Sequence, residues 1–257
     1  MRLMLAAALL AVGACSPAAE TAATAPSTPP ALEAVTLPQS DGAGNQMVAL
    51  EQIGEGGMFC AGGEAWCVLT GDEGAVSVAQ DGGAQVALPT RGERWPNAIV
   101  SQGAAIVGVI ETETQTYSGG GGSASHLTLY RVANGAAMEI AKLPYAAAID
   151  IRACFTEEDT RRRMDACSDQ YNFVSRVRLD ETVTSGAPRI VLETAAGTFP
   201  GRVTRGEDSL ERSALTQADL VWAQDDVCSF RRTYSATAAG PYAPDAELPA
   251  CSDYLEP

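Results

Sequence analysis

The sequence predicts an all-β protein of antiparallel strands arranged in repeated hairpin or meander units. Short runs of alternating apolar and polar residues are divided by glycine-containing turns, which is typical of strands and hairpins. Aromatic residues make up only 6% of the 257 residues, whereas glycine alone occurs 25 times. About 220 residues follow the N-terminal region, which is enough for one large β domain. A sandwich and a propeller-like arrangement both fit this pattern.

The first element along the chain is an export signal. Arg2 supplies a short positive region, and residues 3–12 form an apolar stretch of signal-peptide length. A membrane-spanning helix needs about 20 apolar residues, so this stretch is too short to be one. Cys15 follows the Val-Gly-Ala stretch at 12–14. The alternative interpretation is an ordinary cleaved signal that leaves Cys15 as a plain thiol.

The segment that ends at Cys15 resembles the lipobox of bacterial lipoproteins, which has an aliphatic residue, two small residues and the acylated cysteine. The resemblance covers residues 1–15. It implies that residues 1–14 are a signal peptide that is removed, and that Cys15 carries acyl chains such as palmitate. Two or more chains give stable anchoring. Ser16 rather than Asp follows the cysteine, which by the same resemblance implies an outer-membrane anchor and a protein that faces the periplasm, less often the cell surface.

The next segment, residues 15–34, is predicted to be the lipidated cysteine and a flexible tether. The stretch 16–34 contains no aromatic residue and is dominated by Ala, Pro, Thr and Ser. It would bury too little apolar surface to offset the entropy lost on ordering, and its prolines oppose a helix. The folded part is therefore expected over 35–257, as one domain or as two subdomains that divide near 145–150.

Six cysteines remain once Cys15 is assigned to lipid, and an even number in an exported chain indicates disulfides. They form three close pairs in sequence order, so we expect the bridges Cys60–Cys67, Cys154–Cys167 and Cys228–Cys251. Each bridge contributes roughly 3 kcal/mol in the loop-entropy model. A zinc site would need closer cysteines or supporting histidines, and His126 is the only histidine. We therefore expect no metal and no cofactor.

Two hairpins are predicted in the first half of the folded part. Asp81-Gly82 and Asn134-Gly135 each separate two strand-like runs, and such dipeptides favour hairpin turns because both positions tolerate positive φ. Both hairpins end in Leu-Pro, at 88–89 and 143–144, which suggests a repeated unit. The second unit would hold strands near 97–101, 104–114, 126–133 and 137–142. We interpret the glycines at 119–122 as a flexible loop, because no P-loop lysine or helix follows them.

One short helix is predicted near 157–166. Thr156 and Asp159 form a capping box, and the acids at 157–159 stand four residues before the arginines at 161–163. We interpret these arginines as a solvated face that pairs within the helix rather than as an anion site. Strands are expected near 170–180, 188–195 and 227–235. An irregular segment over 236–257, which we call the closing segment, follows the last of them.

The net charge narrows the range of partners. Removing residues 1–14 removes Arg2 and no acid, which changes the formal net charge from −15 to −16. This charge would repel nucleic acid and anionic lipid headgroups. We therefore expect no nucleic-acid partner. The membrane contact is expected through the N-terminal lipid, and a protein or glycan of the envelope is the expected further partner.

Few residues suggest catalysis. The sequence has no G-x-S-x-G elbow, and position 139, three residues before Lys142, is Glu rather than the Ser of an S-x-x-K motif. His126 is interpreted as a surface residue at the start of a strand. Asp225-Asp226 beside Trp222 is the first place where two carboxylates could act as they do in glycosidases, although acids are common at strand ends. The acids near 72–81 lack the alternating oxygen ligands of a calcium loop.

These observations predict an outer-membrane-anchored periplasmic lipoprotein whose folded part is a non-enzymatic binding or envelope-associated module. Two alternatives remain: a carboxylate-dependent hydrolase of envelope polysaccharide, and an inhibitor of a cationic lysozyme-like enzyme, which the negative charge would suit. The N-terminal motif indicates a location, and no catalytic residues are assigned.

Overall fold

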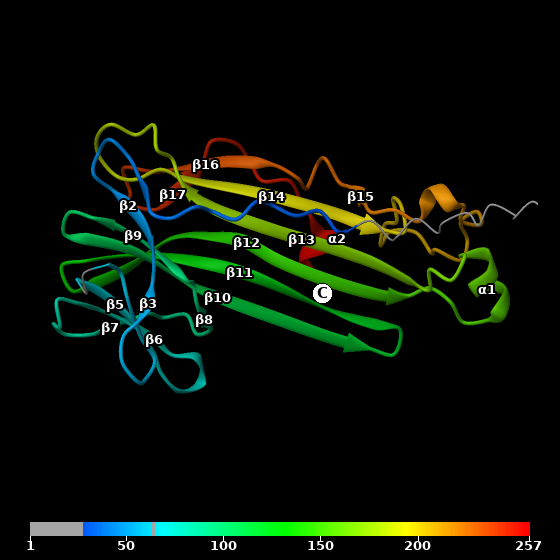
Figure 1. Cartoon of the computed structure of the whole chain (residues 1–257), viewed down its shortest axis with the longest axis horizontal. Coiled ribbons are helices and arrows are strands. Elements are labelled where there is room, and N and C mark those ends of the chain that lie inside the picture. The colour runs from blue at the N-terminus through cyan, green and yellow to red at the C-terminus, as the bar shows by residue number, and fades with distance from the viewer. Residues whose placement is uncertain (1–27, 63–64) are drawn as a thin grey trace, which may run out of the picture.

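The computed structural model describes residues 28–62 and 65–257 and shows an antiparallel all-β protein with two sheets and, within these residues, two short helices (Figure 1). The strands are β1 (Gln39–Ser40), β2 (Gln46–Ala49), β3 (Glu51–Gln52), β4 (Met58–Cys60), β5 (Trp66–Thr70), β6 (Val76–Gln80), β7 (Val86–Ala87), β8 (Glu93–Arg94), β9 (Asn97–Ser101), β10 (Ala104–Tyr117), β11 (Gly120–Ala133), β12 (Ala136–Arg152), β13 (Ser168–Leu179), β14 (Ile190–Phe199), β15 (Ala223–Gln224), β16 (Arg231–Ala236) and β17 (Tyr242–Pro244). The helices are α1 (Glu157–Arg162) and α2 (Ser252–Leu255). The all-β prediction is confirmed.

The larger sheet has twelve strands in the part of the chain that is described, in the order β1-β2-β9-β10-β11-β12-β13-β14-β16-β17, with β8 on β10 and β15 on β14. The smaller sheet has the order β3-β4-β5-β6-β7. Sequential strands pair across hairpins in the centre of the large sheet, so the meander prediction is confirmed there. The two-sheet arrangement fits the sandwich alternative rather than a propeller.

Both predicted hairpin turns occur. Asp81 and Gly82 have φ of 47° and 68°, and Asn134 and Gly135 have φ of 51° and 73°. Asn134-Gly135 forms a two-residue hairpin loop between the paired residues Ala133 and Ala136, and its left-handed conformations match the right-handed twist of the strands. Asp81-Gly82 forms a tight turn, closed by a hydrogen bond from the Gly83 amide to the Gln80 carbonyl at 2.7 Å, within a longer connection from β6 to β7. The first turn follows β6 in the small sheet, and the second joins β11 to β12 in the large sheet.

The prediction of a flexible loop over the glycines at 119–122 is wrong, because β11 begins at Gly120. The whole of β11 pairs with β10, from Tyr117 opposite Gly120 onwards. It also pairs with β12, whose Ile149 lies opposite Gly122. A Cβ on Gly122 would come within 2.7 Å of the Ile149 side chain. The glycines at 120–122 therefore permit close strand packing, and of the four only Gly119 lies in the turn between β10 and β11.

The repeated unit inferred from the two Leu-Pro endings is also not found. Leu88 and Pro89 follow β7 in the small sheet, whereas Leu143 and Pro144 lie inside β12. Pro144 stands opposite His126, where the ladder between β11 and β12 shifts register. Proline is tolerated at such an irregularity because the missing amide donor disturbs the ladder less there. β12 runs without a break through 145–150, so the sheet continues across the suggested division between subdomains.

Three apolar clusters fill the spaces around the large sheet. The first lies between β9–β12 and the layer of β13, β14, β16 and β17, and includes Trp95, Leu127 and Leu192. The second lies between the small sheet and β9–β11, and includes Val78 and Val107. The third, which we call the C-terminal cluster, joins the far half of β11–β14 to the closing segment. Its buried members are Ala124, Ala147, Ile149, Tyr171, Phe173, Ala196, Val203, Cys228, Cys251 and Tyr254.

The disulfides are Cys60–Cys67, Cys154–Cys167 and Cys228–Cys251, the pairs that the spacing predicts. The first joins β4 to β5, the second links the two sides of the α1 segment, and the third fixes the closing segment to the C-terminal cluster. Among the described residues, no helix is long and apolar enough to cross a membrane.

Candidate functional site

The large sheet separates between β12 and β13. These strands pair only where residues 146–152 face residues 168–174. The register shift at His126 precedes this stretch. Beyond it the hydroxyl of Ser175 donates a hydrogen bond to the carbonyl of Pro144 at 2.8 Å, which links the strands by a side chain rather than by the ladder. The end of the ladder leaves room for a cavity beside Tyr145.

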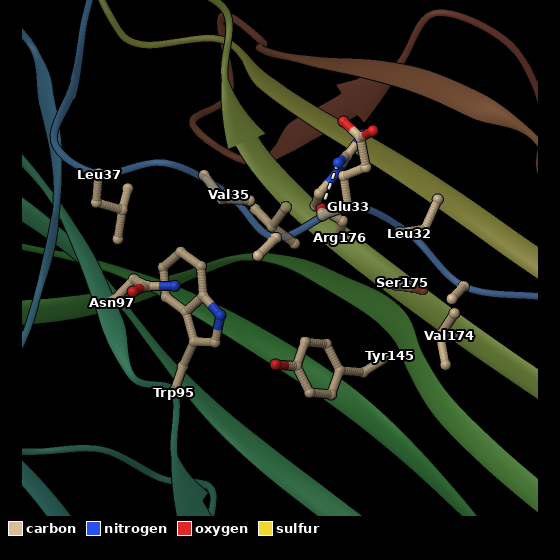
Figure 2. Close-up of a pocket in the computed structure, with 13 residues that line it drawn as sticks. Leu32, Glu33, Val35, Leu37, Trp95, Asn97, Tyr145, Val174, Ser175 and Arg176 are labelled. Atoms are coloured by element: carbon tan, nitrogen blue, oxygen red, sulfur yellow. Dashed lines mark hydrogen bonds between the residues drawn. The ribbon is translucent and has the colours of Figure 1, made fainter.

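This cavity has a volume of about 400 Å³ and lies between the sheet and the chain that precedes β1 (Figure 2). Its size falls within the range of small-molecule sites, about 300–1,000 Å³. Trp95, Asn97 and Tyr145 line one side of it. Most of the remaining lining is aliphatic, from Ala31, Leu32, Ala34, Val35, Leu37, Val174 and Val177.

Residues 28–38, which we call the strap, form the outer wall of the cavity. The strap has no regular secondary structure, and within the described residues no backbone–backbone hydrogen bond joins it to the sheet. Arg176 donates a hydrogen bond to the carbonyl of Glu33. Pro30 lies on Gly197, where an added Cβ would come within 2.6 Å of the proline ring. Leu37 packs against the first apolar cluster. A few side-chain contacts therefore hold the strap in place.

Arginines surround one carboxylate beside the strap. Glu193 accepts a hydrogen bond from Nε of Arg176 at 2.8 Å, and its Oε1 lies 3.2 Å from Arg178 Nη2 and 3.4 Å from Arg231 Nε. Burial raises the pKa of the Glu193 carboxyl, but the hydrogen bond from Arg176 and the neighbouring positive charges lower this pKa on balance. In a chain with a net charge of −15, this cluster of Glu193, Arg176, Arg178 and Arg231 is locally positive.

The cavity also contains uncharged polar groups. The hydroxyl of Tyr145 points toward Trp95 (Figure 2), and the amide of Asn97 is a further polar group in the lining. Burial, and to a smaller extent the charge of Glu93, raise the pKa of Tyr145 above its ordinary value of 10. The phenol is therefore neutral at physiological pH and can donate or accept a hydrogen bond. An apolar site with a few polar groups is typical of ligand pockets.

Of the two acids predicted beside Trp222, Asp225 has a structural role. Asp225 Oδ1 accepts hydrogen bonds from the amides of Val227 and Cys228 at 2.9 and 3.1 Å, and Oδ2 accepts one from the hydroxyl of Tyr254 at 3.2 Å. The groove beside Trp222 has a volume of about 660 Å³, and Asp165 is the only carboxylate among the described residues that line it. Asp225 and Asp226 are not brought to this groove.

His126 lies on β11 opposite Glu111 and outside the strap cavity. Burial, followed by the charge of Lys142, lowers the pKa of His126, and Glu113 and Glu111 offset this in part. Lys142 forms an ion pair with Glu111 at 3.3 Å. The histidine is therefore part of a mixed-charge region on the sheet and is separate from the cavity.

The capping box of α1 is confirmed, but the pairing predicted for its arginines is wrong. Thr156 and Asp159 satisfy each other's backbone amides at the start of the helix. Arg163 lies just after the helix, where its buried guanidinium pairs with Asp169. Arg162 donates to the carbonyl of Arg212 at 2.7 Å. Arg162 is therefore directed to the segment 210–212 and Arg163 to Asp169, and the described residues show no ion pair between either side chain and the acids at 157–159.

The strap cavity was not predicted from the sequence. Its outer wall includes residues 31–34, which the sequence assigns to the tether, and the structure places this stretch against the sheet. The apolar Leu32 within an otherwise polar and small-residue segment is the local signal that could have indicated packing. Cys15 lies outside the described residues.

Comparison of the chain with protein-family models, with curated proteins and with solved structures finds no match. The described residues also contain no cluster of three or more His, Cys, Asp or Glu side chains arranged to hold a metal ion. The evidence for the role of the cavity between the strap and the sheet therefore comes from its geometry and its lining residues.

Proposed function

We propose that the protein is an outer-membrane lipoprotein, attached through Cys15 and facing the periplasm, whose folded part binds a small apolar molecule in the strap cavity. The observation that supports binding is the cavity itself, an aliphatic space of about 400 Å³ with a neutral tyrosine and an amide on one side. Among the described residues, its wall is a segment without a backbone hydrogen bond to the sheet, which provides a route of entry without breaking a β-ladder.

The position of the strap also suits an anchored protein. The strap follows directly on the residues that the sequence predicts as a tether, so the anchor and the wall of the cavity are parts of one continuous segment. A ligand that partitions into membranes would be concentrated where such a protein is held. The hydrolase and the lysozyme-inhibitor alternatives stay predictions, because no specific contact in the cavity favours either.

The binding role is tested with an unlipidated Cys15→Ala chain purified from the periplasm. Val35→Trp places a large side chain into the cavity from the strap, where it does not disturb the sheet. Thr36→Trp is the matched control, since Thr36 is exposed and does not line the cavity. Mass spectrometry of solvent extracts should detect an apolar molecule with the parent and with Thr36→Trp, and much less with Val35→Trp. Equal amounts with all three proteins would contradict the proposal.

The anchor is tested separately by metabolic labelling with a palmitate analogue. We expect label on the parent chain and none on Cys15→Ala, because the acyl chains would attach at this thiol. Membrane fractionation of the same cells should place the parent protein in the outer membrane. Label on Cys15→Ala would refute the lipobox interpretation and leave the cavity result unaffected.

A further inference from the structure

The shape of the cavity indicates the form of its ligand. Strap residues that line it run almost without interruption from Ala31 to Leu37. At about 3.3 Å per residue, an extended chain of this length covers about 20 Å. Figure 2 shows the strap crossing above Tyr145 and Trp95. A long and narrow aliphatic wall of this kind fits a flexible hydrocarbon chain better than a compact ring system.

One side of the cavity carries the positive charge of Arg176, which has hydrogen-bond donors that are not used within the described residues. Arg176 lines the cavity and uses three of its five N–H groups in the hydrogen bonds that the described residues show, two to Glu193 and one to the carbonyl of Glu33. The side chain of Arg176 is 20% exposed, so the guanidinium is partly shielded from water. Two N–H groups therefore remain for an anionic oxygen, and hydrogen bonds between charged partners are stronger than neutral ones.

The surrounding charges favour an anion over a cation at this point. Arg176, Arg178 and Arg231 supply three positive charges around Glu193. Glu33 adds a carboxylate, but this residue is exposed on the strap, where water and salt screen its charge. The five groups around Arg176 sum to one positive charge, within a chain that is strongly acidic. The charge of Glu93 acts on Tyr145, at the other side of the cavity, so the positive charge is confined to the side of Arg176.

From this juxtaposition, and resting on the binding role proposed above, we infer that the ligand is a single-chain amphiphile with an anionic headgroup. Its hydrocarbon chain lies along the strap between Leu32 and Trp95, and its headgroup receives hydrogen bonds from Arg176. A carboxylate head and a phosphate monoester head share this chemistry. The first would come from a fatty acid and the second from a lysophospholipid-like molecule.

The test compares four probes of equal chain length on the Cys15→Ala chain by isothermal titration calorimetry, below their micelle concentrations. The probes are dodecanoate, dodecyl phosphate, dodecanol and dodecyltrimethylammonium. We expect at least one anion to bind about tenfold or more tightly than dodecanol, because hydrogen bonds between charged partners are stronger than neutral ones. The cation should bind most weakly, because the positive charge of Arg176 repels it. The tighter anion identifies the source of the headgroup.

Variants locate the headgroup. Arg176→Gln should remove most of the advantage of the anion over dodecanol while the affinity for dodecanol changes little. Arg178→Gln is the matched control, because it removes the same charge from the Glu193 cluster but does not line the cavity. It should reduce the affinity for the anion less than Arg176→Gln does. If Arg176→Gln only loosened the strap, dodecanol and the anion would lose affinity equally.

The outcomes separate this inference from the proposed function. Equal affinity for dodecanol and both anions, abolished by Val35→Trp, would overturn the anionic headgroup and leave apolar binding in place. Equal losses for anion and alcohol in Arg176→Gln would likewise remove the role of this arginine. Failure of all four probes to bind, together with no apolar molecule in the solvent extracts, would overturn both.

Discussion

The two ends of the folded chain lie on opposite faces of β14. Ala196 faces the C-terminal cluster, whereas Gly197 lies beneath Pro30 of the strap. Successive residues of a strand point to opposite sides of a sheet, so these neighbours mark the two faces. The closing segment is fixed by Cys228–Cys251 and by the buried ring of Tyr254. The strap has no such attachment and leaves a cavity beneath it.

The closing segment is therefore firmly packed onto the sheet, whereas the strap is attached to it by few contacts. The closing segment packs Tyr254 against Tyr171 and Phe173, with ring centroids 6.1 and 6.2 Å apart, and its disulfide lies within the same cluster. The strap meets the sheet through Arg176, Pro30 and Leu37. Segments with few buried contacts and no backbone ladder open at low cost in free energy, and binding regions are often of this kind.

The largest effect on the unfolding free energy is expected where the closing segment covers the sheet, from the double variant Cys228→Ser with Cys251→Ser. The bridge spans a sequence separation of 23, for which the loop-entropy model gives about 3 kcal/mol of unfolding free energy. Urea unfolding measured under oxidising conditions should show this loss. The control is the double variant Cys60→Ser with Cys67→Ser in the small sheet, which should lose somewhat less. An unchanged midpoint for the first variant would mean that packing alone holds the closing segment.

A smaller effect on the same side is expected from Tyr254→Phe. The Tyr254 hydroxyl donates to Asp225 at 3.2 Å, and burial followed by the charge of Asp225 raises the pKa of this phenol, so it is protonated at neutral pH. Loss of a hydrogen bond to a carboxylate costs about 1.5 kcal/mol. Thermal or urea unfolding measures the change. The ring packing stays, so a loss as large as that of the disulfide variant would contradict this account.

The strap should contribute little to global stability. Deletion of residues 1–34 leaves Leu37 in place, and the part of this stretch that the structure describes, residues 28–34, belongs to no backbone ladder. We therefore expect the unfolding free energy to fall by about 1 kcal/mol or less. Hydrogen exchange of the parent chain gives an independent measure. The amides of residues 31–37 should exchange far faster than those of β13 and β14. Protection of the strap equal to that of these strands would erase the distinction between the two segments.

The smallest effect is expected from acid, which should lower the unfolding free energy through Glu193, beside the strap. The pKa of Glu193 is lowered in the folded protein, so its contribution to stability is complete above the ordinary glutamate value of 4.5 and is lost as the pH falls through the lower folded value. Unfolding free energies measured from pH 7 to pH 3 should therefore decline at the acidic end. Glu193→Gln should flatten part of this decline. An identical pH profile for parent and variant would assign the decline to other carboxylates.

Local sequence signals predicted much of the fold. The Asp81-Gly82 and Asn134-Gly135 turns and the capping box at Thr156 depend on a few neighbouring residues, so they are readable from a single chain. The loop predicted over the glycines at 119–122 is wrong because their role depends on neighbouring strands: Gly122, for example, lies against the side chain of Ile149, almost thirty positions later. Glycine composition alone does not distinguish a loop from close strand packing.

The candidate site was harder to predict, because its parts are distant in sequence. Trp95, Tyr145 and Arg176 meet only through the register of the large sheet and the end of the ladder between β12 and β13. Arg176, Arg178 and Arg231 also meet around Glu193 only in the folded sheet. Arg176 and Glu193 are directly opposite in the β13–β14 ladder, a relation that the sequence does not display.

The attachment of the strap also determines how the molecule would respond to tension. A pull at residue 28 would first load the contact of Pro30 with Gly197 and then the hydrogen bond from Arg176 to Glu33. These contacts would therefore break one after another and not all at once. The pull would meet a backbone ladder only at Gln39, where β1 begins. Strain applied from the N-terminal side would thus uncover the cavity before it sheared the sheet.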